Sequence, residues 1–143
     1  MKNIILTGFL LGVIPVSSYA SDWMHVFDSD TEEYHINLNS IKNVNGYDKD
    51  LIQAWYKRKI YNDIVKDGMG VGDEMLVLYH FDCKKEKIGI SQAVKYKNKK
   101  PFGESLNARV PNMRTVVPDT IGSEALERAC TIYEIKNNPE NYM

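Results

Sequence analysis

Cys83 and Cys130 are the residues with the most definite chemistry in this chain of 143 residues, because they are its only cysteines. Two thiols can form a disulfide, bind a metal or act as a redox pair. Metal and redox sites use closely spaced ligands, and this chain has neither a CxxC motif nor a cluster of histidines beside either cysteine. We therefore predict a structural disulfide, which stabilises the fold by about 4 kcal/mol in a chain-entropy treatment.

The three histidines, His25, His35 and His80, are the next candidates for metal binding or acid–base chemistry. Each falls in a different predicted strand, and none has the partner four residues away that a helical metal site uses. We interpret them as ordinary sheet positions and predict neither a metal nor a cofactor. A Ser-His-Asp site stays open because such triads are assembled in space, although the chain has no G-x-S-x-G motif.

Two loops contain residues typical of ligand binding. Residues 68–73 include three glycines, as phosphate-binding loops do, but Asp73 and Glu74 and then a predicted strand follow them. Residues 28–33 are mostly acidic, but they lack the glycine and the final glutamate of a helix-loop-helix calcium site. We interpret the first segment as a loop between strands and the second as a solvated turn.

Lysines gather at both ends of one predicted hairpin. Lys84, Lys85 and Lys87 surround its tight connection, and a second group lies within residues 97–100. The intervening strand separates the two groups by about 30 Å, well beyond the ~8 Å screening length at physiological salt. We take Lys84, Lys85 and Lys87 as candidate protein-binding residues. The alternative is that these lysines only keep the turn soluble.

Residues 1–20 have the pattern of an export signal. Lys2 supplies a positive start, residues 4–16 are mainly apolar, and Ser18 and Ala20 place small residues where a signal peptidase cuts. A membrane span needs about 20 consecutive apolar residues, and this stretch is shorter. We predict cleavage after Ala20 and a single domain over residues 21–143. Because no cysteine lies at the cleavage site, we expect an exported protein of the periplasm or cell surface that is not a lipoprotein.

Alternating apolar residues predict an antiparallel sheet in the first three quarters of the domain. The expected strands cover residues 23–27, 34–38, 51–60, 75–83, 88–96 and 114–117. Trp23, His25 and Phe27 are expected on one face, as are Ile88 and Val94 on their strand. Residues 75–83 are apolar on both faces, which predicts a central strand covered on both sides. Residues 101–103 are expected to end the hairpin.

From residue 121 the apolar spacing becomes helical, with Asp119 or Thr120 as the expected N-cap. Cys130 lies on the apolar stripe, so the disulfide would join this helix to the end of the central strand. The predicted class is α+β: an antiparallel β-sheet of five or six strands with one C-terminal α-helix packed on it, tied by one disulfide. Charges nearly balance, with a formal net charge of −1, so nothing favours nucleic acid as a partner.

Several short motifs, taken in order, resemble one known family. They are Trp23-x-x-Val26, Tyr34-His35-Ile36-Asn37 with Ser40-Ile41, Ala54-Trp55-Tyr56-Lys57-Arg58, Tyr79, Asp82-Cys83, Val117-Pro118-Asp119-Thr120, Leu126 and Cys130. The pattern resembles the surface-adhesin protein E family of small exported Gram-negative proteins. The resemblance implies the fold described above and adhesion to host matrix and serum proteins such as laminin, vitronectin and plasminogen. The resemblance assigns no binding residue to this chain. The adhesin that names the family is a surface lipoprotein, whereas we expect this chain not to be one.

We therefore expect a non-enzymatic binding module with a protein partner, no nucleic acid and no membrane span. Adhesion to host proteins is the specific hypothesis. The first alternative is a periplasmic inhibitor or immunity protein acting on an envelope hydrolase. A second alternative is a hydrolase whose site is assembled in space. The sequence makes no prediction of oligomeric state.

Overall fold

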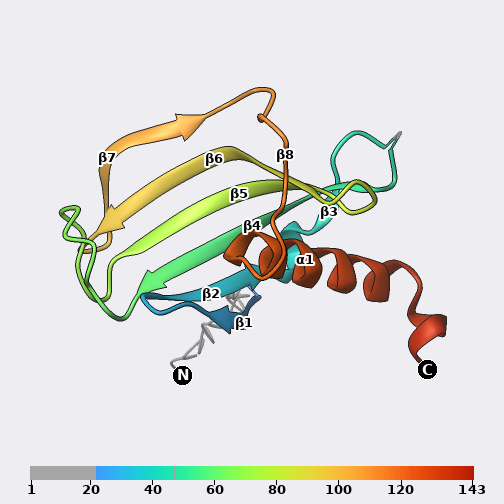
Figure 1. Ribbon diagram of the computed structural model, residues 1–143, viewed down its shortest axis with the longest axis horizontal. Coiled ribbons are helices and arrows are strands. Elements are labelled where there is room, and N and C mark those ends of the chain that lie inside the picture. Colours follow the sequence, from blue (N-terminus) through green and yellow to red (C-terminus); the bar gives the residue numbers. More distant parts are fainter. Residues whose placement is uncertain (1–21, 47) are drawn as a thin grey trace, which may run out of the picture.

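The computed structural model describes residues 22–46 and 48–143, so the predicted export signal lies outside the described residues. Most of the described chain forms strands, followed by one long helix (Figure 1). The elements are β1 (Trp23–Asp28), β2 (Glu32–Asn37), η1 (Leu38–Ser40), β3 (Lys42–Asn43), β4 (Leu51–Ile60), β5 (Glu74–Asp82), β6 (Lys87–Lys97), β7 (Lys100–Asn107), β8 (Arg114–Thr115), α1 (Ile121–Asn137) and η2 (Pro139–Tyr142).

The strands form one antiparallel sheet in the order β1-β2-β4-β5-β6-β7, with β3 paired to β4 and β8 paired to β6. The predicted α+β class is confirmed. Six strands make the continuous path, and the two additional ones have two residues each. In Figure 1 α1 lies against one side of this sheet, and its C-terminal end extends beyond the strands.

The core lies between α1 and the sheet face that meets it, called here the inner face. Alternation places every second residue of β4 on this face, and Ile52, Ala54 and Tyr56 are fully buried there. Phe81 of β5 and Ala129 of α1 are fully buried against them. The small side chain of Ala129 lets the helix approach the sheet closely. The aromatic side chains of the sheet fill the space that remains between the two layers.

Helix α1 begins with a capping box, so Thr120 rather than Asp119 is the N-cap. The Thr120 hydroxyl accepts a hydrogen bond from the Ser123 backbone N–H, and the Ser123 hydroxyl accepts one from the Thr120 N–H. These bonds satisfy two backbone donors that the first helical turn leaves free. They fix where the chain leaves β8 and enters the helix.

The faces predicted for β1 change at a β-bulge between His25 and Phe27. His25 pairs with His35 on the outer face, as the alternation predicts. Phe27 pairs with Tyr34 and packs on it at 4.5 Å between ring centroids, on the inner face. The extra residue, Val26, reverses the alternation, so the expectation that His25 and Phe27 share a face is wrong.

A second bulge divides β6. Tyr79 pairs with Ile90 and Leu78 pairs with Gln92, so Ser91 is the additional residue. Ile88 and Ile90 therefore lie on the inner face, whereas Val94 lies on the outer face, and the prediction that they share one face is wrong. The Ser91 carbonyl accepts a hydrogen bond from the Ala108 N–H at 2.7 Å, which satisfies a group that the bulge removes from the ladder.

The hairpin does not end at residues 101–103, because they belong to β7. Asn98 and Lys99, both with positive φ, form a tight turn, and the chain then pairs back along β6. Pro101 is tolerated there because β7 is an edge strand.

Helix α1 covers only the inner face, so the expectation of a strand covered on both sides holds for β5 on one side alone. On the outer face Leu78 is still only 6% exposed, and its register neighbours are Trp55 and Gln92. Residues 111–113 approach Gly89 on the same face. Its neighbours on the adjacent strands therefore shield Leu78 without a second helical layer, and residues 111–113 cover the neighbouring position Gly89.

Candidate interaction site at the β5–β6 turn

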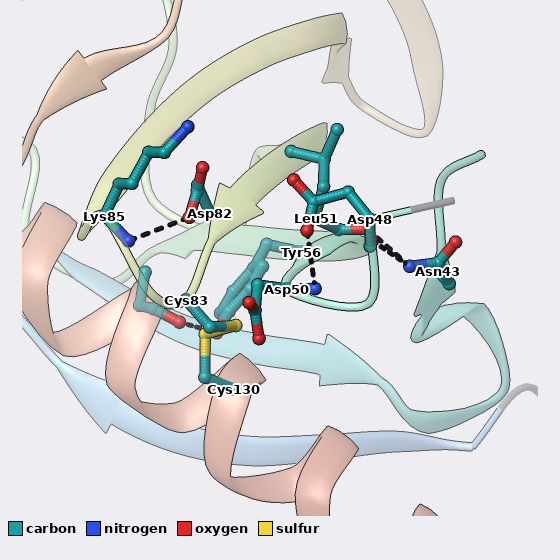
Figure 2. Close-up of a disulfide and its surroundings, with 10 residues drawn as sticks. Asn43, Asp48, Asp50, Leu51, Tyr56, Asp82, Cys83, Lys85 and Cys130 are labelled. Atoms are coloured by element: carbon teal, nitrogen blue, oxygen red, sulfur yellow. Dashed lines mark hydrogen bonds between the residues drawn. A yellow bond between two sulfur atoms is a disulfide. The ribbon is translucent and has the colours of Figure 1, made fainter. Parts of the chain in front are cut away.

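Cys83 and Cys130 form the predicted disulfide, which joins the residue after β5 to α1 (Figure 2). Their Cα atoms are 5.9 Å apart. The Cys83 N–H also donates a hydrogen bond of 2.9 Å to the carbonyl oxygen of Asp50, just before β4. The start of the β5–β6 turn is thus held by the helix on one side and by the neighbouring strand on the other.

Two further contacts fix α1 on the sheet. The Tyr56 hydroxyl donates a buried hydrogen bond of 2.7 Å to the Ala125 carbonyl oxygen. Burial raises the pKa of Tyr56, so its hydroxyl keeps the proton that it donates. Near the other end of the helix, Lys136 Nζ donates to the Leu38 carbonyl oxygen at 2.7 Å. The helix is therefore held near its start, at the disulfide and in its last turn.

The β5–β6 turn presents the candidate lysines on this fixed base. Asp82 is buried, and its carboxylate accepts a hydrogen bond from the Lys85 N–H at 2.8 Å (Figure 2). Lys84 and Lys85 are exposed at the tip, whereas Lys87 is half-buried in the first position of β6. The structure thus brings the three predicted residues to one end of the molecule, with two of them exposed.

The sequence alone does not assign Asp82 to the turn or Tyr56 to the contact with α1. An aspartate three residues before a turn amide is a common side-chain cap, so Asp82-Cys83-Lys84-Lys85 carries a usable signal. A tyrosine on a buried face needs a partner for its hydroxyl. Nothing in the sequence identifies that partner as Ala125, because 69 positions separate the two residues.

His25 and His35 lie side by side across β1 and β2, with ring centroids 5.3 Å apart, while His80 lies on β5. Asp28 Oδ1 is 2.6 Å from His25 Nε2. His35 Nδ1 is buried and has no hydrogen-bond partner among the residues that the structure describes. Burial, followed by the charges of Lys57 and His25, lowers the pKa of His35, which favours a neutral ring.

Residues 68–73 lie in a connection between strands, as predicted, and form the last part of the segment 61–73 between β4 and β5. Asp73 holds this part in place. The Asp73 carboxylate accepts backbone hydrogen bonds from Gly70 at 2.8 Å and from Asn98 at 3.1 Å. These bonds lower the pKa of Asp73. Its two carboxylate oxygens thus bind the β4–β5 loop and the β6–β7 turn, which lie at the same end of the sheet. Of the acidic segment 28–33, only residues 29–31 form the turn, because Asp28 ends β1 and Glu32 and Glu33 begin β2. Ser29 Oγ accepts a hydrogen bond from the Glu32 N–H across this turn.

Several hollows border α1. One of about 770 Å³ lies at the helix start, one of about 530 Å³ lies beside Cys83, Cys130 and Tyr133, and a smaller one of about 230 Å³ is lined by α1 and residues 24–26. The first two linings contain no histidine, and the third contains His25 without a serine or an aspartate, so none of the three presents the Ser-His-Asp arrangement left open above. Across residues 22–46 and 48–143, no group of three or more His, Cys, Asp or Glu side chains is placed to hold a metal ion. In the same ranges no helix has the length and apolar character to cross a bilayer.

This architecture is similar to that of known protein structures. Two crystal structures of Haemophilus influenzae protein E match it, with TM-scores of 0.53 and 0.55 at 13% and 12% sequence identity. Each match covers 85% of this chain, and 92% and 96% of the respective protein E chains. At this identity the likeness establishes the fold alone. No curated protein sequence gives a significant match.

Family membership is established by a sequence model of a whole family rather than by a single relative. This family model describes surface-adhesin protein E, and it matches residues 23–131. That range begins at β1 and ends just after Cys130, so it includes the whole sheet, the disulfide and most of α1. The chain belongs to the surface-adhesin protein E family.

Proposed function

We propose that this protein is an exported adhesin that binds host matrix or serum proteins of the laminin, vitronectin and plasminogen class. Family membership supports an adhesin-type function. The disulfide supports export, because such bonds persist in oxidising compartments. Cleavage after Ala20 and release without lipid attachment are parts of the same proposal.

The observation that carries the proposed contact surface is the β5–β6 turn. Lys84 and Lys85 project from a turn held by the disulfide, by Asp82 and by the backbone bond to Asp50. A fixed turn loses little conformational freedom when a partner binds, so more of the contact energy remains as affinity. We propose that Lys84 and Lys85, with Lys87 beside them, contact acidic groups of the host protein.

Binding of the oxidised protein to immobilised laminin, vitronectin and plasminogen tests this proposal. K84A/K85A is expected to weaken binding about tenfold, since each charge at an interface edge contributes around 0.5–1 kcal/mol. The matched control is K99A/K100A, which removes two exposed lysines from the opposite end of β6 and is expected to leave affinity unchanged. An equal loss in both variants would refute the assigned surface.

Protease treatment of intact cells tests the location. A surface adhesin is degraded in intact cells, whereas a periplasmic protein is protected until the outer membrane is opened. If the wild-type protein binds none of the three host proteins, is protected in intact cells and co-purifies with an envelope hydrolase, the inhibitor alternative replaces the adhesin.

A further inference from the structure

The hollow at the start of α1 is a groove with an apolar floor and an acidic rim. Phe27, Val116 and Leu126 contribute to the floor. The rim contains Asp28, Glu86, Asp119, Glu124 and Glu127, and the lining has no lysine, arginine or histidine. Its volume of about 770 Å³ falls within the ~300–1,000 Å³ range of ligand sites. A few side chains of a partner therefore fit in it.

The helix alone does not explain this concentration of charge. Carboxylates in the first turn favour helix formation because they face the positive end of the helix dipole, which accounts for Asp119 and Glu124. That effect fades beyond the first turn, so it does not account for Glu127. Asp28 and Glu86 belong to the end of β1 and to the β5–β6 turn. Three separate segments thus deliver negative charge to one groove.

Most of this charge is not neutralised within the protein. Asp28 is 2.6 Å from His25 Nε2, and Glu124 is 2.7 Å from Arg128. Glu86, Asp119 and Glu127 form no ion pair with any residue in the described ranges. Like charges converging on a partly enclosed surface repel one another and concentrate the field there. A cation in the groove relieves this repulsion.

We propose that the groove binds a basic segment of a protein partner, with lysine or arginine heads at Glu86 and Glu127 and apolar groups on the floor. Lysine and arginine suit both parts of the groove, because their aliphatic stems pack on apolar surface while their charged heads reach the rim. An apolar neighbour in the same segment fills the remaining floor. The inference rests on the proposed function and deepens it, because it specifies the partner's chemistry.

Fluorescence anisotropy with synthetic hexapeptides tests the groove on the full oxidised chain. The probe KLKKLK combines four lysines with two leucines, and KSKKSK keeps the charge without the apolar groups. Wild-type protein is expected to bind KLKKLK several-fold more tightly than KSKKSK, and both more weakly as salt rises. Equal affinity for the two peptides would overturn the proposal, because the floor would then contribute nothing.

E86Q/E127Q is expected to weaken KLKKLK binding about tenfold, the effect of losing two charge contacts. The control E104Q/E140Q removes the same charge from exposed sites on β7 and η2 and is expected to leave binding unchanged. All four positions are exposed, and thermal unfolding verifies that both variants fold. An equal loss in the control would overturn the proposal. So would a wild-type dimer that E86Q/E127Q dissociates, because the occupant would then be a second copy.

The same variants separate this inference from the proposed function. If wild-type protein captures a host protein and E86Q/E127Q does so equally well, adhesion stands and the groove inference fails. If the peptide binds through Glu86 and Glu127 but no host protein is captured, the groove inference stands and adhesion fails.

Discussion

His35 has a buried ring nitrogen with no hydrogen-bond partner in the described part of the chain, and it faces His25 across the strand pair. A buried acceptor without a partner is destabilising by about 1–3 kcal/mol. Protonation would not relieve this easily, because burial, Lys57 and His25 all lower the pKa of His35, and only the weaker influences of Glu33 and Asp28 oppose them. The folded protein therefore binds fewer protons near neutral pH than the unfolded chain, whose histidine titrates near 6.5.

The first prediction is that acid weakens the fold through His35. The unfolding free energy is expected to fall as the pH decreases below about 6.5 and to level off once the pH passes the lowered pKa of the folded state. Burial lowers the pKa of His80, which acts in the same direction. H35F removes the buried nitrogen and the titrating group, so it is expected to stabilise the protein by about 1 kcal/mol at neutral pH and by more at pH 5.

Urea denaturation at pH 7.5 and pH 5 measures this effect. H25F, which makes the same substitution at the half-exposed neighbouring position, is the control, and it is expected to retain the pH dependence because Nδ1 of His35 stays buried. A pH dependence in H35F equal to that of the wild type would contradict the prediction.

Tyr56 makes a second prediction at the residue scale. Y56F deletes one buried hydrogen bond, from the hydroxyl to the Ala125 carbonyl oxygen, and leaves the ring in the core. The expected loss of stability is about 1 kcal/mol, the usual net contribution of such a bond. Tyr61 provides a matched control because its hydroxyl donates to the Ser29 carbonyl oxygen at an exposed position. Y61F is expected to change stability by less than about 0.5 kcal/mol. Equal effects in chemical denaturation would show that burial of the bond is unimportant.

The elements themselves were largely predictable, because alternation in β4 and the helical spacing after residue 121 are local patterns with one buried face. The bulges at Val26 and Ser91 were not. A bulge is defined by two residues facing one on the neighbouring strand, so it depends on pairing that a single strand does not encode. This is why Phe27 and Ile90 lie on the inner face although simple alternation, taken from His25 and Val94, predicts the outer one.

The surfaces proposed for binding also include one that local sequence predicts and one that it does not. The lysine turn was predictable because Lys84 and Lys85 are adjacent in sequence and lie between two clear strands. The acidic groove was not, because Asp28, Glu86 and Glu127 come together only when β1, the β5–β6 turn and α1 are packed. The residues that line the groove are spread from Phe27 to Glu127, so no local sequence pattern identifies it.

Gly89 provides a prediction at the scale of elements. An added Cβ at this position would lie 2.7 Å from Met113 Sδ and 3.1 Å from the Asn112 carbonyl oxygen. The methionine end can move, but the carbonyl belongs to the backbone of the segment that leads into β8. G89A is therefore expected to push residues 111–113 away from β6 and to destabilise the protein by about 1–3 kcal/mol.

Gly122 supplies the opposite case. It lies in the first turn of α1, and the nearest atom to an added Cβ, Thr120 Oγ1, is 3.8 Å away, an ordinary contact. G122A is expected to stabilise the protein by about 0.5 kcal/mol, because alanine loses less backbone freedom in a helix. Thermal unfolding of the two variants tests the pair, and a change of the same sign in both would contradict the prediction.

At the scale of the whole molecule, α1 contributes few fully buried apolar side chains to the core. Only Ala125, Leu126 and Ala129 are buried among its 17 residues. Two of these are alanines, whose burial contributes little compared with the 1.5–3 kcal/mol of a larger apolar side chain. The remaining attachment comes from Ile132 and Tyr133, which pack partly buried against the core, and from Tyr56, Lys136 and the disulfide. The helix also forms part of the floor and rim of the groove, so its attachment determines whether that groove exists.

The last prediction follows from this dependence. The disulfide links positions 47 residues apart, which corresponds to about 4 kcal/mol of stabilisation in a chain-entropy treatment. C83A/C130A is expected to lower the melting temperature by roughly 15 °C for a domain of this size. Amide hydrogen exchange is expected to increase first in α1, while β4 and β5 keep their protection because their pairing does not involve the bond. Loss of protection that is uniform across α1 and the sheet would instead mean that the helix is held by packing, and that the disulfide stabilises the domain only as a whole.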